Sequence, residues 1–84
     1  MKILLKEQEV QGEYLFTGQV YMTKGFQESF GEDALFVVLH TMALIKERVD
    51  LGIADYLQVA FADEVIFWVI DDVDHITFLM PQDY

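Results

Sequence analysis

The sequence predicts an α+β domain in which one amphipathic helix packs on one face of an antiparallel sheet of four to five strands. Between residues 30 and 49, apolar residues recur at three- and four-residue steps, which is typical of a helix. After residue 55 come three runs rich in β-branched and aromatic residues. The segments between these runs are so short that neighbouring strands must be antiparallel. The 84 residues are expected to form one domain, 1–84.

Residues 1–25 are predicted to be extended. The best strand formers lie at residues 20–23, and residues 13–16 are a shorter candidate. Thr17 and Gly18 are suited to a hairpin turn between the two, although one bent strand fits nearly as well. Lys24 and Gly25 are expected to end this segment.

The helix is expected to start near residue 30, because Ser29 and Glu32 have the spacing of a capping box. Lys46 and Arg48 lie in its last turn, where the helix dipole favours cations, and it should end before Gly52. The apolar spacing predicts a core-facing stripe made of Leu35, Val38, Leu39, Met42, Ile45 and Val49.

The three strands are predicted at residues 56–62, 65–70 and 75–80. In the first, Leu57, Val59 and Phe61 share one face. The second is apolar on both faces, with Val65, Phe67 and Val69 on one side and Ile66, Trp68 and Ile70 on the other. A strand of this kind is expected to be buried on both sides.

One helix covers only one face of a sheet. The second face must therefore be covered by the N-terminal segment, by a second copy of the chain or by another protein. Large exposed apolar patches usually mark such interaction sites. A homodimer formed through Ile66, Trp68 and Ile70 is the first expectation.

The composition restricts the possible partners. The chain has 15 acidic and 5 basic residues, a formal charge of −10, and is 54% hydrophobic. Such a surface repels phosphates, so no direct nucleic acid binding is expected, whereas basic proteins suit it. The absence of cysteine excludes thiolate metal sites and disulfides. No apolar run approaches the ~20 residues of a membrane span, so a cytoplasmic protein that does not enter membranes is expected.

Strand direction is expected to gather several acids at one end of the sheet, close to the end of the helix. This acidic pole is a candidate docking surface for a basic protein or a candidate divalent cation site, although its spacing is not that of an EF-hand loop. Acids also collect in turns simply because turns are solvated. The pole comprises Asp50, Asp55, Asp71, Asp72 and Asp74, with His75 beside them.

No catalytic motif is present. The chain lacks a Gly-rich phosphate loop, a nucleophile elbow and a zinc protease motif, so we expect neither an enzyme nor a cofactor. His40 and His75 fall on different elements without a motif around either, and His40 is expected at the surface. The aromatic residues are interpreted as core and interface.

Two short motifs resemble those of a small uncharacterised protein family from Gram-positive bacteria and their phages and plasmids. They are Tyr-Met-Thr-Lys-Gly at residues 21–25, followed by Glu-Ser at 28–29, and Asp-Tyr-Leu-Gln-Val at residues 55–59. Residues 80–84 are similar to the usual ending of that family. Gly31 departs from it, since members have proline there, and members are more basic in the last strands. The resemblance covers residues 21–62 and implies no catalytic residues.

The leading hypothesis is a small acidic, non-enzymatic interaction protein that self-associates through its apolar sheet face and binds a basic or DNA-binding protein through the acidic pole. One alternative is a divalent-metal-binding domain that uses the Asp-rich turn. Another is a DNA mimic that inhibits a nuclease or a repressor.

Overall fold

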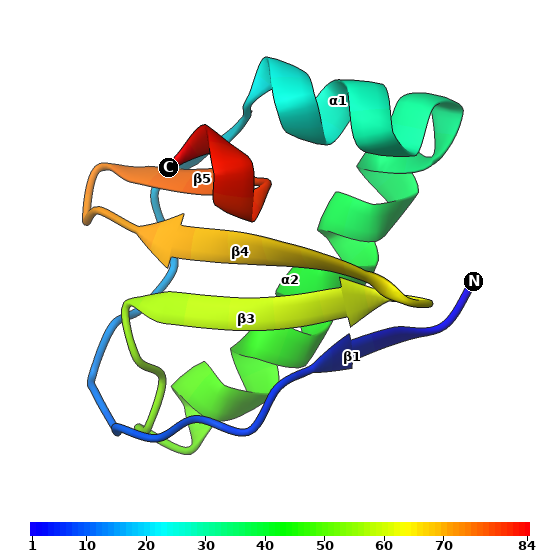
Figure 1. The fold of residues 1–84 in the computed structure, drawn as a ribbon. Helices are drawn as coiled ribbons and strands as arrows, with labels where there is room; N and C mark the ends of the chain where they lie inside the picture. Colours follow the sequence, from blue (N-terminus) through cyan, green and yellow to red (C-terminus); the bar gives the residue numbers. More distant parts are fainter.

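One five-stranded sheet forms the centre of the computed structural model, which describes residues 1–84 (Figure 1). The strand order is β1-β3-β4-β5-β2, and the long helix passes behind the sheet in this view. The predicted α+β class is thus confirmed. The strands are β1 (Ile3–Leu5), β2 (Gln19–Met22), β3 (Leu57–Ala62), β4 (Val65–Asp71) and β5 (His75–Leu79). The helices are α1 (Lys24–Phe30) and α2 (Ala34–Asp50), with single 3-10 turns η1 (Gly31–Asp33) and η2 (Pro81–Asp83).

The predicted C-terminal strands are confirmed within one residue at each end. β3, β4 and β5 form an antiparallel meander in which Val59 lies opposite Trp68, and Trp68 lies opposite Leu79. Asp63 adopts a positive φ of 53° in the tight turn between β3 and β4. Short connections thus do produce antiparallel neighbours.

The N-terminal region differs from the prediction. Residues 13–16 form no strand, and the hairpin turn predicted at Thr17 and Gly18 is absent. Instead, β1 adds antiparallel to β3, the chain crosses the end of the sheet, and β2 adds parallel to β5. Backbone hydrogen bonds from Gly12 to Ile53 and from Tyr14 to Ala54 hold the crossing loop. Because this loop carries the chain from one sheet edge to the other, residues 13–16 cannot pair with β2.

The helical region also starts earlier than predicted. Thr23 caps α1, its hydroxyl accepting a hydrogen bond from the Phe26 N–H at 3.1 Å. Ser29 lies inside α1, so the predicted capping box with Glu32 does not form. Gly31, at φ 53°, then ends α1 and separates it from α2.

The core-facing residues of α2 match the predicted stripe only in part. Val38 and Ile45 are buried as expected, but Leu35 and Leu39 are 62% and 63% exposed. Met42 and Val49, the other residues of the predicted stripe, are half-buried and pack against the core. The buried residues of α2 are Ala34, Val37, Val38, Thr41 and Ile45.

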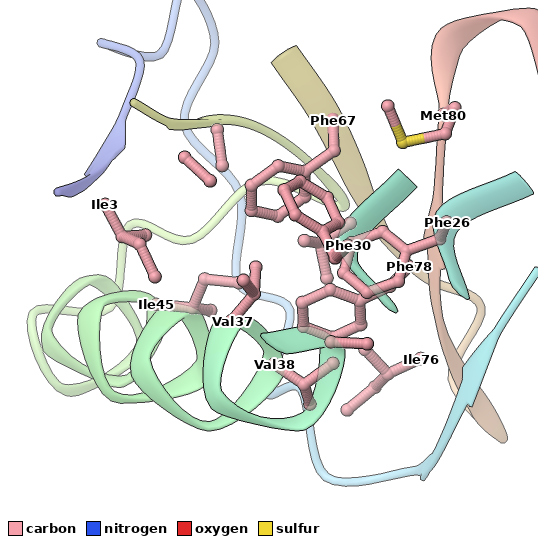
Figure 2. Close-up of a cluster of buried hydrophobic side chains, with 14 of the residues drawn as sticks. Ile3, Phe26, Phe30, Val37, Val38, Ile45, Phe67, Ile76, Phe78 and Met80 are labelled. Carbon is pink, nitrogen blue, oxygen red and sulfur yellow. The ribbon is translucent and has the colours of Figure 1, made fainter. Parts of the chain in front are cut away.

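Four phenylalanine rings form the centre of the core (Figure 2). The Phe26 ring centroid lies 4.8 Å from that of Phe30 and 5.5 Å from those of Phe67 and Phe78. Edge-to-face and tilted contacts of this kind add about 0.5–1.5 kcal/mol each to the burial of apolar area. The cluster joins α1 to β4 and β5.

We expect Phe67→Ala to lower the free energy of unfolding by about 3–5 kcal/mol, because it removes a fully buried ring from this cluster. Phe36→Ala is the matched control, since the Phe36 ring is half exposed on α2, and should cost about 0.5 kcal/mol or less. Urea unfolding followed by circular dichroism measures both. Equal losses for the two variants would contradict the packing described here.

Candidate interaction surface

The sheet face turned away from the helices is apolar and no secondary structure lies across its centre; Figure 1 looks onto it. Cross-strand pairs on this open face are Leu57 with Ile70, Val59 with Trp68, and Phe61 with Ile66. Leu57, Val59 and Phe61 therefore do share one face, as predicted, and it is the face opposite the helices. The helix side of β3 instead carries Gln58, Ala60 and Ala62, all buried.

Gln58 is a polar residue buried on the helix side of β3, and its hydrogen bonds explain how this is possible. Its side-chain carbonyl accepts a hydrogen bond from Arg48 Nη1 at 2.6 Å, and its amide donates to Gln8 and to the Asp55 carbonyl. Arg48 also donates to the Lys6 carbonyl at 2.8 Å. Burial lowers the pKa of the Arg48 guanidinium, and Glu7 opposes that shift. The Arg48 guanidinium therefore has a structural role.

The C-terminal residues border the open face. The Tyr84 ring meets Trp68 edge to face at 5.6 Å between centroids. Asp83 holds this segment, its Oδ2 accepting hydrogen bonds from Thr23 Oγ1 at 2.6 Å and from the Met80 N–H at 2.9 Å. A Cβ on Gly25 would stand 2.5 Å from the Asp83 carboxylate, so a larger residue there would force that carboxylate to move.

A hollow of about 550 Å³ opens on this face next to Tyr84. Tyrosine rings form much of its wall, and the Tyr14 and Tyr56 centroids lie 5.9 Å apart. We call it the tyrosine hollow. Its lining contains two aspartates and no lysine or arginine. The complete lining is Tyr14, Tyr56, Ile70, Asp71, Asp72, Val73, Thr77, Leu79 and Tyr84.

Asp71, assigned to the acidic pole, has a structural role. It is only 5% exposed, and its two carboxylate oxygens accept hydrogen bonds from the Phe16 and Val73 N–H groups, each at 2.9 Å. Phe16 itself is buried at a positive φ of 50°. Asp71 therefore fixes the crossing loop that brings Tyr14 to the hollow.

The remaining pole residues fall into different environments. Asp72 and Asp74 are exposed in the turn between β4 and β5. Asp50 lies on α2 with its carboxylate 3.5 Å from Lys46 Nζ, and Asp55 accepts a hydrogen bond from the Tyr56 N–H. Next to the turn, the His75 ring packs on Tyr21, 5.1 Å between centroids.

The acidic pole does not form a metal centre in this fold. No group of three or more histidine, aspartate or glutamate side chains is placed to hold a metal ion. Asp71, the most central of these acids, is turned inward to backbone amides, which removes it from any such group. The pole therefore lacks the group of ligands that the metal-binding alternative requires.

Of the predicted interface residues, Ile66, Trp68 and Ile70 all lie on the open face, with Ile66 at the β3–β4 end and Ile70 lining the hollow. Sequence reasoning missed Tyr14 and Tyr84. Tyr14 reaches the hollow only through the long crossing loop, and Tyr84 only through η2. No local spacing signals either placement.

No protein-family model matches the chain, and neither the curated proteins nor the solved structures compared with it contain a significant match. The family resemblance stays a prediction. No helix of the structure has the length and hydropathy that a membrane span requires.

Asp71→Asn should lower the free energy of unfolding by about 2–3 kcal/mol, because an amide group would face one of the two N–H donors and that hydrogen bond would be lost. Asp72→Asn, which changes an exposed neighbour by the same atoms, should have almost no effect. Chemical denaturation of both variants measures the difference. If the two variants are equally stable, the anchoring role is wrong.

Asp83 should make stability depend on pH. The hydrogen bonds from Thr23 and Met80 lower the pKa of the Asp83 carboxyl below its usual value. Its contribution is therefore complete above the unfolded-state pKa of about 3.9 and is lost as the pH falls through the lower folded-state pKa. Wild type should be more stable than Asp83→Asn near neutral pH, and the difference should shrink in acid.

Urea midpoints across this acid range measure that difference. Glu64→Gln, at an exposed position, is the control and should show no comparable change. A gap between wild type and Asp83→Asn that stays constant down to the lowest pH would contradict the assignment.

Proposed function

We propose that this protein is a non-enzymatic interaction module that binds a basic and partly apolar segment of another protein in the tyrosine hollow. The observation that carries the proposal is the lining of that hollow, which combines three tyrosines and two aspartates with no cationic side chain. Apolar surface, aromatic rings and negative charge together suit lysine or arginine side chains with aliphatic neighbours.

Such a contact combines cation–π, apolar and charge interactions. A lysine or arginine over a tyrosine face gains about 0.5–1 kcal/mol at an exposed site and ~2 kcal/mol when water is excluded. Ile70 and Leu79 form an apolar surface in the hollow against which aliphatic side chains can pack. Exposed Asp72 places a negative charge at the rim. The net charge of −10 adds long-range attraction, which speeds the association of a basic partner.

The charges favour a basic partner over a second copy at this hollow. A second copy would bring another −10, and the hollow has no cation to pair with that copy's aspartates. Juxtaposed like charges oppose association. At this hollow, the charges therefore favour a basic partner over the homodimer predicted from the sequence.

The lining also supports a binding role over catalysis. It holds no histidine, cysteine, serine or lysine, so the groups left for proton transfer or nucleophilic attack are the tyrosine hydroxyls, Thr77 and the two aspartates. One of its two carboxylates, Asp71, is already occupied by backbone amides.

Trp68 gives a direct test, because it is the single tryptophan and lies on the open face. A peptide of alternating lysine and leucine should change Trp68 fluorescence in a saturable way, and added salt should weaken its binding. A peptide of alternating glutamate and leucine should leave the emission unchanged.

The double variant Asp72→Asn, Asp74→Asn should bind the lysine peptide about tenfold more weakly. Its matched control is Glu32→Gln, Asp33→Asn, which removes the same charge from exposed positions before α2 and should bind like wild type. Equal weakening in both would show that only net charge matters, and would overturn the assignment to the hollow.

A further inference from the structure

The tyrosine hollow contains an aromatic corner formed by two rings from distant parts of the chain. The Tyr14 and Tyr56 rings are tilted by 56° to each other, and their centroids lie 5.9 Å apart. Two rings so placed can both lie within ~6 Å of one bound cation, which is the range of cation–π attraction. Tyr84 adds a third ring to the lining. Several aromatic rings around one small space are typical of sites that bind quaternary ammonium groups.

The backbone that carries this corner is held in place by hydrogen bonds. The Tyr14 N–H donates to the Ala54 carbonyl at 3.0 Å, and the Asp71 N–H donates to the Tyr56 carbonyl at 2.9 Å. The Asp71 carboxylate also accepts the Phe16 N–H, which fixes the loop on the other side of Tyr14. A site that is formed in advance loses less free energy when a ligand orders its side chains.

Asp71 gives the hollow a negative charge but little capacity to accept further hydrogen bonds. Both of its carboxylate oxygens already accept backbone N–H groups, and the residue is only 5% exposed. The remaining side-chain acceptors of the lining are hydroxyl groups and the exposed Asp72. The hollow therefore attracts a cation more readily than it satisfies hydrogen-bond donors.

This property distinguishes between kinds of cation. A lysine ammonium has three N–H donors and an arginine guanidinium has five, and a donor left without a partner opposes binding. A trimethylammonium group keeps the positive charge but has no N–H donor. It therefore needs no acceptor, and its methyl groups can contact rings and aliphatic side chains.

We infer that the tyrosine hollow binds a trimethylammonium group carried by a methylated lysine of the partner, which presupposes the function proposed above. The tyrosine rings and Asp71 attract the charge, while Ile70 and Leu79 give the methyl groups apolar contacts. The volume of about 550 Å³ falls within the ~300–1,000 Å³ of small-molecule sites. The hollow thus has room for this group and for part of a neighbouring side chain.

Peptide binding tests the preference, and Trp68 fluorescence reports it because Tyr84 of the hollow packs on Trp68. The lysine–leucine peptide with its central lysine trimethylated should bind about tenfold more tightly than the unmodified peptide. A neutral analogue, with carbon in place of the ammonium nitrogen, should lose this gain because it has the same shape without the charge.

Choline tests a second source of the same group, since it is a small free molecule with a trimethylammonium head. It should bind at least about tenfold more weakly than the methylated peptide, because it lacks the neighbouring side chains. Choline binding as tightly as that peptide would overturn the assignment to lysine and indicate a small quaternary ammonium compound.

Tyr56→Leu tests the aromatic corner. It should reduce the preference for the methylated peptide to about threefold or less, whereas Tyr56→Phe, which retains the ring, should keep it. Tyr21→Leu is the matched control and should also keep the preference. Tyr21 and Tyr56 are 48% and 46% exposed, but Tyr21 does not line the hollow. Circular dichroism spectra show whether each variant is folded.

Failure of this assignment differs from failure of the proposed function. Equal binding of the methylated and unmodified peptides would overturn the trimethylammonium assignment and leave the proposed function standing. Equal binding of the methylated peptide and its neutral analogue, or a preference unchanged in Tyr56→Leu, would overturn the same assignment. If neither the methylated nor the unmodified peptide binds, both proposals are wrong.

Discussion

The phenylalanine cluster between α1 and the sheet determines much of the rest of the structure. Phe67 and Phe78 rise from the central strands, and Phe26 and Phe30 close over them from α1. α2 packs beside this cluster, over β1 and β3, where the sheet presents Gln58, Ala60 and Ala62. Leu35, Phe36 and Leu39 of α2 stay exposed, whereas Met42, Leu44 and Val49 pack against the core.

Much of the fold could be predicted from local patterns, and the failures have physical causes. The meander of β3, β4 and β5 follows from short turns and β-forming residues, which act locally. The edge strands do not: β1 is only three residues long, and β2 pairs parallel with a strand more than fifty residues away. Such pairings depend on how the crossing loop is held at Ile53, Ala54 and Asp71. The predicted core face of α2 wrongly included Leu35 and Leu39, because apolar spacing alone does not show which apolar side chains the sheet covers.

The candidate site was predictable in its apolar part and less so in its polar part. A strand apolar on both faces implied an uncovered sheet surface around Trp68, because one layer of helices cannot cover both sides. The predicted turn at the end of the sheet grouped Asp71 with Asp72 and Asp74, but their environments differ. Asp71 points inward at two backbone amides, while the other two face solvent. Burial of a single carboxylate is set by tertiary contacts, here with Phe16, and has no signature in the local sequence.

The interleaved order of the strands has a consequence for how the chain folds. The three central strands are consecutive and can zip together through local contacts, whereas β1 and β2 must be brought from the start of the chain to the two outer edges. Closing those long loops costs chain entropy before any pairing rewards it. We therefore expect the first two dozen residues to become ordered late in folding. Because Tyr14 belongs to that region, the wall of the tyrosine hollow is completed only when the last edge strands have docked.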